Sequence, residues 1–267
     1  MKLAAIIGRS KTGVAALPAL YLLASACVAD EIAQPQQRSG YAFMSRETQA
    51  MQDDDRVNPG MLWVLEGETL WSTKAGSAGR ACADCHGDAA NAMKGVAARY
   101  PAFDAKSDRP IDLEQRINRC RSEHQAATAF AWESKELLAL TAYVARQSRG
   151  MAIETGADAR LRPFVDEGRD LFGRRQGQIN IACSQCHDDN WGRRLAGSTV
   201  PQGHPTGYPL YRLEWQSMAS LQRRLRGCMI AIRAQPYDYG APQNVDLELY
   251  LMWRASGMPI ETPAVRP

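Results

Sequence analysis

The motif Cys-x-x-Cys-His occurs twice in the chain, and no other feature constrains the fold as strongly. Its copies are formed by Cys82, Cys85 and His86 and by Cys183, Cys186 and His187. Two cysteines one helical turn apart reach both vinyl groups of one porphyrin, and the adjacent histidine then lies beneath the iron. A thioredoxin-like pair would need an apolar strand before the motif, and a zinc site would need four protein ligands at each copy. The motifs therefore predict two covalently attached c-type haems, with His86 and His187 as axial iron ligands.

The first thirty residues have the pattern of an export signal. Basic residues are followed by an apolar stretch over residues 13–26 and then by acidic residues. About 14 apolar residues interrupted by Pro18 are too few to span a bilayer, which argues against a transmembrane helix. We expect a signal peptide over residues 1–29, cleaved near Ala26 or Ala29, and a periplasmic location for the mature chain.

Cys27 adds a less favoured alternative to simple cleavage. Residues 24–27 weakly resemble a lipoprotein cleavage box, but the leucine usually found three positions before the cysteine is absent. Lipid anchoring through Cys27 is therefore the secondary expectation.

Removal of the signal peptide leaves a chain with no net formal charge. The full sequence has 32 Lys and Arg residues and 29 Asp and Glu residues, and three of the basic residues lie in the signal peptide. A neutral chain gives no electrostatic support for nucleic-acid binding. Export also places the remaining six cysteines in an oxidising compartment, where an unpaired thiol needs an explanation.

The mature chain is an internal duplication. Residues around the first haem motif recur 101 positions later, and those around Cys120 recur 108 positions later. The second copy has seven more residues between its haem motif and Cys228, near residues 203–207. Each copy has a helical pattern before the motif and another at its end, which is the layout of a class I cytochrome c domain. We predict a mostly α fold with two tandem class I cytochrome c-like domains and long loops, over residues 30–152 and 153–267.

Capping residues and apolar spacing predict where these helices lie. They are expected over residues 58–74, 157–175, 134–149 and 244–255. Pro59 suits the first helical position of the first of these helices. Ser134 and Asn244 are the expected N-caps of the two closing helices.

Two further cysteines, Cys120 and Cys228, occupy matching positions in the two copies. Each lies on the apolar stripe of its helix, because a leucine or isoleucine precedes it by three and by seven positions. A packed free thiol and a Cys120–Cys228 disulfide are the alternatives. Reduced thiols rarely persist after export, and the duplication places the two cysteines in separate domains. We therefore favour Cys120 and Cys228 as the second axial ligands of the two irons.

Methionine is the rival ligand, since electron-transfer cytochromes c commonly use it. The unmatched candidates are Met93, Met218, Met229 and Met252, together with His124 and His204. Met151 and Met258 do recur, but they follow the closing helices and are expected to pack against them. Because a thiolate stabilises ferric iron and lowers the potential, cysteine-ligated haems would be poor general electron carriers.

Arginines gather around Cys228. Arg224 lies one helical turn before it, and residues 212–233 contain five arginines against one acid. The plainer interpretation is that arginines hold haem propionates. The surplus near Cys228 also suits an anionic oxyanion bound in bidentate fashion, and positive charge favours the nucleophilic thiolate. We expect a catalytic Cys228 with Arg224 as a catalytic and substrate-binding residue beside it.

Three runs carry a family resemblance: residues 203–212, 224–229 and 113–121. They resemble the SoxA family, the cytochrome subunits of the bacterial thiosulfate-oxidising Sox system, and both haem motifs match its dihaem members. The resemblance implies an L-cysteine S-thiosulfotransferase that works with a small monohaem cytochrome, SoxX. It implies that Cys228 is the active-site cysteine, often carried as a persulfide, with Arg224 beside it. It also implies that His86 and Cys120 bind the first haem iron.

The implied reaction couples thiosulfate to a cysteine of a sulfur-carrier protein, SoxYZ. Two electrons then pass through haem c to a cytochrome acceptor. Two rival functions remain: a dihaem electron-transfer cytochrome with Met or His ligands, and a dihaem peroxidase with a five-coordinate or histidine-switched haem. Sulfur ligation at both irons argues against both rivals.

Overall fold

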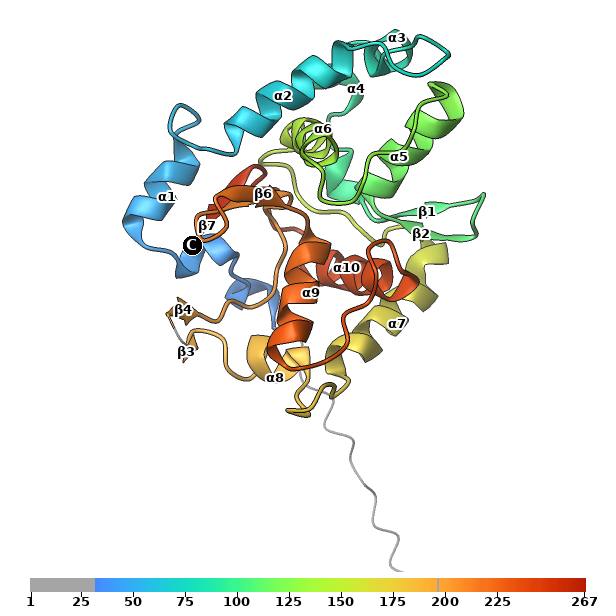
Figure 1. Cartoon of the computed structure of the whole chain (residues 1–267). Helices are drawn as coiled ribbons and strands as arrows, with labels where there is room; N and C mark the ends of the chain where they lie inside the picture. Colours follow the sequence, from blue (N-terminus) through green and yellow to red (C-terminus); the bar gives the residue numbers. More distant parts are fainter. Residues whose placement is uncertain (1–31, 196) are drawn as a thin grey trace, which may run out of the picture.

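The computed structural model describes residues 32–195 and 197–267, so the expected signal peptide and Cys27 lie outside the described residues. Two helix-rich halves follow one another along the chain (Figure 1). The α-helices of the described part are α1 (Arg46–Asp53), α2 (Met61–Ser72), α3 (Cys82–His86), α4 (Ala89–Ala92), α5 (Leu113–His124), α6 (Lys135–Arg146), α7 (Arg162–Gly173), α8 (Cys183–His187), α9 (Leu221–Ala231) and α10 (Pro242–Arg254). Among these residues, none of the helices has the length and apolar character needed to cross a membrane.

The two halves repeat one arrangement of four helices, in which α2, α3, α5 and α6 correspond to α7, α8, α9 and α10. In each half the helix before the haem motif packs closely on the closing helix. Gly67 of α2 and Gly168 of α7 lie at these crossings, where a Cβ would collide with the backbone carbonyl of Ala139 or Asp246. The recurring glycine therefore serves close helix packing, and the expected duplication is confirmed.

The closing helices test the two expected N-caps. Ser134 caps α6 as predicted, because its hydroxyl accepts a hydrogen bond from the backbone N–H of Leu137 at 3.2 Å. The prediction for Asn244 is wrong, since α10 begins at Pro242. Proline has no N–H to leave unsatisfied and fits the first helical position. The Asn244 side chain instead donates to the Asp238 carbonyl at 2.7 Å and is buried.

The helix predicted from Asn58 also begins later than expected. The Asn58 carboxamide accepts a hydrogen bond from Gly60 N at 2.9 Å and donates to the Pro263 carbonyl at 2.9 Å. This buried side chain thus ties the entrance of α2 to the C-terminal end of the chain, and the α-helix begins at Met61.

Two hairpins precede the sulfur-bearing helices α5 and α9, and the strands of the described part are all short. They are β1 (Ala102–Asp104), β2 (Arg109–Ile111), β3 (Arg194–Leu195), β4 (Ser198–Thr199), β5 (Leu210–Arg212), β6 (Ser217–Ala219) and β7 (Ala264–Arg266). The antiparallel pair β1–β2 leads into α5, and the pair β5–β6 leads into α9. β7 pairs in parallel with β5, so the C-terminal strand joins the hairpin before α9.

The N-terminal segment crosses to the C-terminal half. The Gln37 amide donates to the backbone carbonyl of Arg254 at 2.9 Å, and the Ser39 hydroxyl donates to Glu261 at 2.5 Å. α1 also lies against β7. The division of the mature chain between residues 152 and 153 stays a prediction. In the structure, the N-terminal segment packs on the C-terminal half.

The first turns of α5 and α9 meet at the junction of the two halves. Gln222 of α9 is fully buried, donates to Asp112 Oδ2 at 2.7 Å and accepts from Gly240 N at 2.8 Å. Asp112 in turn caps α5 by accepting from Gln115 N at 2.7 Å. A second polar contact, between Arg109 and Asp246 at 2.8 Å, also crosses the junction.

Three carboxyl groups at this junction hold protons more tightly than usual. Burial raises the pKa of Asp112 to about 7. Burial, together with the neighbouring charge of Asp112, raises the pKa of Glu114 to about 8. Burial and the charges of Asp112 and Glu114 raise the pKa of Glu248, on α10, well above its ordinary value, although Gln222 opposes this by a hydrogen bond. Protonation of these three carboxyl groups therefore stabilises the junction.

These shifts predict how stability depends on pH. Each group has a folded pKa above its unfolded value, so its contribution is complete below about pH 4 and is lost as the pH rises through the folded pKa. We expect the free energy of unfolding to fall between pH 5 and pH 8, and Glu248→Gln to make that fall shallower. Urea denaturation of the holoprotein at several pH values measures both. Glu66→Gln, at an exposed ion pair with Lys135, is the control and should leave the slope unchanged. An equal slope in wild type and Glu248→Gln would contradict the prediction.

Candidate functional site

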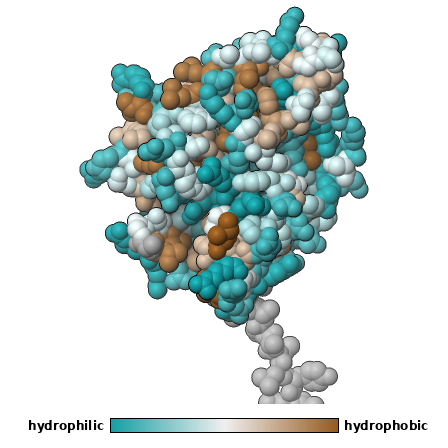
Figure 2. Space-filling model, viewed as in Figure 1, coloured by the Kyte–Doolittle hydropathy of each residue, from teal (hydrophilic) through white to brown (hydrophobic). Residues whose placement is uncertain are grey.

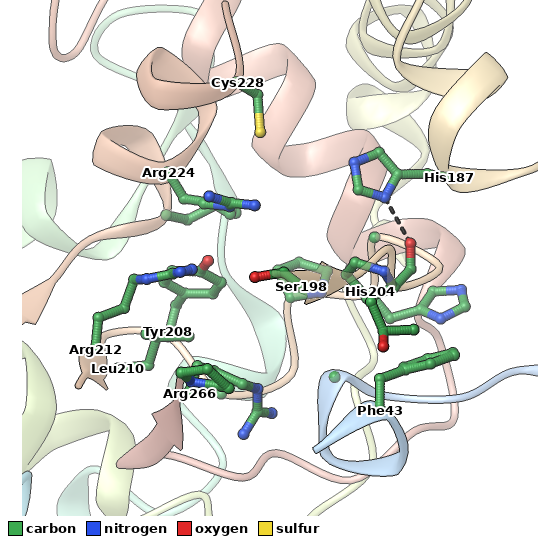
Figure 3. Close-up of a pocket in the computed structure, with 18 of the residues that line it drawn as sticks. Phe43, His187, Ser198, His204, Tyr208, Leu210, Arg212, Arg224, Cys228 and Arg266 are labelled. Carbon is green, nitrogen blue, oxygen red and sulfur yellow. Dashed lines mark hydrogen bonds between the residues drawn. The ribbon is translucent and has the colours of Figure 1, made fainter. Parts of the chain in front are cut away.

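A cavity of about 560 Å³ lies in the C-terminal half, where α8 and α9 face the loop that joins β4 to β5 (Figure 3). Its apolar wall comes from α7, α9 and α10 and consists of Phe172, Leu221, Leu225, Leu247 and Leu251. Its polar wall includes four arginines: Arg194, Arg212, Arg224 and Arg266. Cys183, His187 and Cys228 also line the cavity. In the space-filling view, hydrophilic residues cover most of the visible face, with apolar residues in scattered groups (Figure 2).

His187 is held in one orientation at the end of α8. Its Nδ1 lies 2.6 Å from the backbone carbonyl oxygen of Pro201, the contact dashed in Figure 3. A carbonyl only accepts hydrogen bonds, so Nδ1 carries a proton, and Nε2 is the ring nitrogen left to face Cys228. Histidines that ligate metals usually donate their other ring N–H in this way. The ring of His187 also lies within hydrogen-bonding reach of Cys228.

Cys228 projects from α9 toward His187, as Figure 3 shows. Burial raises the pKa of its thiol, but the His187 hydrogen bond and the charges of Arg224 and Arg212 outweigh burial. The pKa of Cys228 is therefore lowered from its usual range. The thiolate is the form that binds metals and acts as a nucleophile.

Arg224 lies beside Cys228 without an acidic partner. Among the described residues it forms no ion pair with a carboxylate, and its pKa is raised chiefly by the charge of Cys228. Arg212 bonds at the rim to Glu214 at 3.0 Å, while its Nε is buried without a hydrogen-bond partner in the described chain. Arg266 is paired with Glu261 at 2.6 Å. Of these three arginines, Arg224 is thus the one without a carboxylate partner among the described residues.

The N-terminal half has the corresponding residues in a different electrostatic setting. Arg116 is the counterpart of Arg224 at the 108-residue offset, and it donates to Asp104 at 3.1 Å and to the Tyr100 hydroxyl at 3.2 Å. Arg119 also pairs with Asp104. The residue 108 positions after Asp104 is Arg212. A carboxylate that neutralises arginines in the first half is therefore replaced by a further arginine in the second.

The thiols of the N-terminal half reflect this difference. Cys120 of α5 lies near enough to Cys82 and Cys85 of α3 for their charges to act on one another. Burial raises the pKa of Cys120, although Arg116 opposes it. The ring of His86, the last residue of α3, lies with its centroid 5.7 Å from that of Trp71. The two halves thus share one layout of side chains, but the pKa of the helix-borne thiol is raised in the first half and lowered in the second.

Comparison with known proteins agrees with this layout. The family described as SoxA/TsdA, cytochrome c domain, matches residues 66–153 and 167–260. The L-cysteine S-thiosulfotransferase subunit SoxA of Pseudaminobacter salicylatoxidans is 40% identical over 85% of this chain and 80% of its own length. The subunit of the same name from Rhodovulum sulfidophilum is 34% identical over 86% of this chain and 80% of its own.

The chain belongs to the SoxA family. A solved structure also matches, the crystal structure of SoxXA from P. pantotrophus, with a TM-score of 0.83 and 30% identity over 86% of this chain and 87% of that one. Membership of the SoxA family confirms the predicted cytochrome c fold and covalently bound haem c. The number of haems per chain stays a prediction.

The residues of the SoxA-family C-terminal site fit a haem c group. Cys183 and Cys186 are on the one-turn helix α8, and all six cysteines of the described residues are free, so the alternative Cys120–Cys228 disulfide does not form. His187 Nε2 and Cys228 supply one nitrogen and one sulfur toward the same cavity. Its leucine-rich wall suits a porphyrin face, and Arg212 and Arg266 suit the propionate groups.

The structure brings most of the sequence-predicted site residues together. Cys183, Cys186, His187 and Cys228 form one cluster with Arg224, and Cys82, Cys85 and Cys120 form another at α3 and α5 near His86. The sequence places Arg212 among the basic residues near Cys228 but assigns it no role of its own. The signal for Arg212 is its position in the repeat: it lies 108 residues after Asp104, where the first copy has a carboxylate.

If each motif attaches its own haem, removing the cysteines of one motif should remove one haem and leave the other. The double variant Cys183→Ser/Cys186→Ser should lose one covalent haem and keep the other, and Cys82→Ser/Cys85→Ser should do the converse, because thioether bonds need both sulfurs of one motif. Intact mass of the purified mature chains and their haem absorbance measure this. A wild-type chain that carries a single haem would overturn the assignment.

Proposed function

We propose that this chain is the catalytic cytochrome subunit of an L-cysteine S-thiosulfotransferase. In this role it couples thiosulfate to a cysteine thiol of a sulfur-carrier protein of the SoxYZ type and delivers two electrons to a cytochrome acceptor. The names of the curated relatives support the activity. The similarity to SoxXA from P. pantotrophus supports a SoxX partner. A periplasmic location agrees with the export signal expected over residues 1–29.

One observation carries the proposal: an arginine without an acidic partner faces the thiol with the lowered pKa. Arg224 and Arg212 contribute positive charge beside Cys228, whereas in the other half Asp104 stands at the position of Arg212 and pairs with Arg116, the counterpart of Arg224. Arginine binds oxyanions through paired N–H groups. A sulfonate bound there would place the sulfane sulfur of thiosulfate next to the Cys228 sulfur. A cytochrome that only carries electrons has no need of such a pair.

The reaction divides into two balanced steps at Cys228. In the first, the thiolate and the sulfane sulfur of thiosulfate form an S–S bond and release two electrons, which leave to the cytochrome acceptor. In the second, the carrier thiol loses its proton and its sulfur attacks the sulfane sulfur. The Cys228 thiolate leaves, and the carrier keeps the thiosulfonate. Cys228 is thus nucleophile, sulfur relay and leaving group.

The other residues prepare these steps. Arg224 and Arg212 hold the sulfonate, and together with the His187 hydrogen bond they lower the pKa of Cys228, which favours its nucleophilic thiolate form. Cys183, Cys186, His187 and Cys228 are the residues that would hold haem c, which supplies one-electron acceptance when bound. In the N-terminal half, Cys82, Cys85, His86 and Cys120 would hold the second haem c.

Replacement of Cys228 tests the relay. Cys228→Ala should lower thiosulfate-dependent coupling to the carrier by at least about 1,000-fold, because no other thiol in the described chain faces the arginine pair. The measurement is the mass of the carrier after incubation with thiosulfate and an oxidised cytochrome. Cys120→Ala is the matched control and should retain coupling. Unchanged coupling by Cys228→Ala with both haems attached would refute the proposal.

Replacement of Arg212 tests the charge difference between the halves. Arg212→Asp recreates the pairing found at Asp104, so it should neutralise Arg224 and lower kcat/KM for thiosulfate by about 10- to 100-fold. Arg212→Gln should cost less, because it removes a charge without adding an opposing one. The converse variant Asp104→Asn, in the other half, is the control and should leave kcat/KM near wild type. Equal effects of Arg212→Asp and Arg212→Gln would contradict the argument.

A further inference from the structure

Gln202 lies at the centre of a contact between the N-terminal segment and the C-terminal cavity. Its side chain is completely buried. The carboxamide oxygen accepts from the backbone N–H of Arg38 at 2.6 Å, and the amide nitrogen donates to the Gln36 carbonyl at 3.0 Å. Both ends of this side chain are therefore bound to the backbone of a segment more than 160 residues away in sequence.

The loop that contains Gln202 also holds the ring of His187. The residue before Gln202 is Pro201, whose carbonyl accepts from His187 Nδ1 at 2.6 Å. The residue after it is Gly203, which has a φ of +73°, and a Cβ there would lie 3.3 Å from the His187 ring. The loop can therefore follow the ring closely only with glycine at this position. Any movement of this loop moves the acceptor of the His187 N–H.

The N-terminal half has no corresponding support. Within residues 32–195 and 197–267, neither ring nitrogen of His86 forms a hydrogen bond. The second repeat has seven additional residues between its haem motif and its helix-borne cysteine, near this loop. The extra length thus coincides with a contact that only the C-terminal histidine has.

We propose that Gln202 is a positioning residue for His187, through which the N-terminal segment fixes the orientation and tautomer of the C-terminal axial ligand. The inference rests on the proposed function only in taking His187 as an iron ligand. Gln202 anchors Pro201 against residues 36–38. The Pro201 carbonyl keeps the proton on Nδ1, so that Nε2 faces the cavity and Cys228. A hydrogen bond of this kind also raises the basicity of the ligating nitrogen.

Loss of the Gln202 hydrogen bonds to residues 36–38 should weaken the bond between His187 and the iron. Loss of outer hydrogen-bond partners costs about 10- to 100-fold in metal affinity at other histidine sites. Added imidazole would compete with His187, while the thioethers keep the haem in place. The apparent affinity for imidazole at the C-terminal haem should therefore rise by about tenfold when the anchor is removed.

The first test uses Gln202→Met, which keeps the volume and removes both hydrogen bonds. Imidazole titration of the ferric holoprotein, followed by electron paramagnetic resonance, should show tighter binding at the C-terminal haem, which is the haem that Cys183→Ser/Cys186→Ser lacks. The midpoint potential of the same haem should rise, because His187 becomes a weaker donor. Gln222→Met is the matched control, since Gln222 is equally buried and bonded through both amide atoms but does not touch this loop. It should lower the thermal unfolding temperature without changing imidazole affinity.

The second test leaves Gln202 in place and guards against a folding defect. Arg38→Pro removes the backbone N–H that binds the Gln202 carboxamide and also fixes φ at residue 38, whereas Arg38→Ala keeps the N–H; Arg38 is exposed. Arg38→Pro should reproduce the tighter imidazole binding, and Arg38→Ala should match wild type. Wild-type imidazole affinity and spectra in both Gln202→Met and Arg38→Pro would overturn the proposal.

A further variant separates this outcome from a failure of the proposed function. His187→Gly should change the spectrum of the C-terminal haem. An unchanged spectrum would show that His187 is not the ligand, which refutes the iron assignment on which the inference depends. Retained coupling activity in Cys228→Ala would refute the proposed transferase mechanism and leave the imidazole result with its meaning intact.

Discussion

The arginine beside each helix-borne thiol needs a negative partner, and the two halves supply different ones. In the N-terminal half Asp104 accepts from Arg116 and also pairs with Arg119, so one carboxylate partly balances two arginines. In the C-terminal half Arg212 stands at the position of that carboxylate, and Arg224 has the Cys228 thiolate as its main negative neighbour. Buried charge is costly unless it is paired. The charge of Cys228 therefore helps to stabilise the Arg224 guanidinium in the C-terminal site.

The two halves can differ in charge near their thiols because their helix packing depends on other residues. The crossings at Gly67 and Gly168 fix each motif-leading helix on its closing helix, whatever the charges near the thiols. The first turns of α5 and α9 meet through Gln222 and Asp112, so the two sulfur-bearing helices share one anchor. With both helices held at their first turns, side chains further along can change without loss of the fold. Duplication thus supplied two equal sites, and substitution at the position of Arg212 made them unequal.

The sequence predicts those features that have local causes. Motif spacing gives the cysteine and histidine pairs, the offsets give the duplication, and Ser134 is identified as an N-cap by its residue type. The misplaced cap at Asn244 shows the limit, because Pro242 competes for the helix start and the asparagine serves the Asp238 loop instead. The anchoring of Gln202 joins segments far apart in the chain, and no local pattern marks such contacts. The opposed charges at Asp104 and Arg212 are readable only by aligning the repeats.

The Cys228 thiol and a bound sulfonate would both interact with the positive charges of Arg224 and Arg212. Arg224 and Arg212 lower the pKa of Cys228, and the charge of Cys228 is the largest cause of the raised pKa of Arg224. A sulfonate bound by these arginines would reduce the share of positive charge that stabilises the thiolate. The nucleophilicity of a thiolate rises with its basicity. In the proposed mechanism, binding of the sulfonate would therefore make Cys228 a stronger nucleophile when the sulfane sulfur lies beside it. The two arginines would thus couple substrate recognition to the reactivity of Cys228.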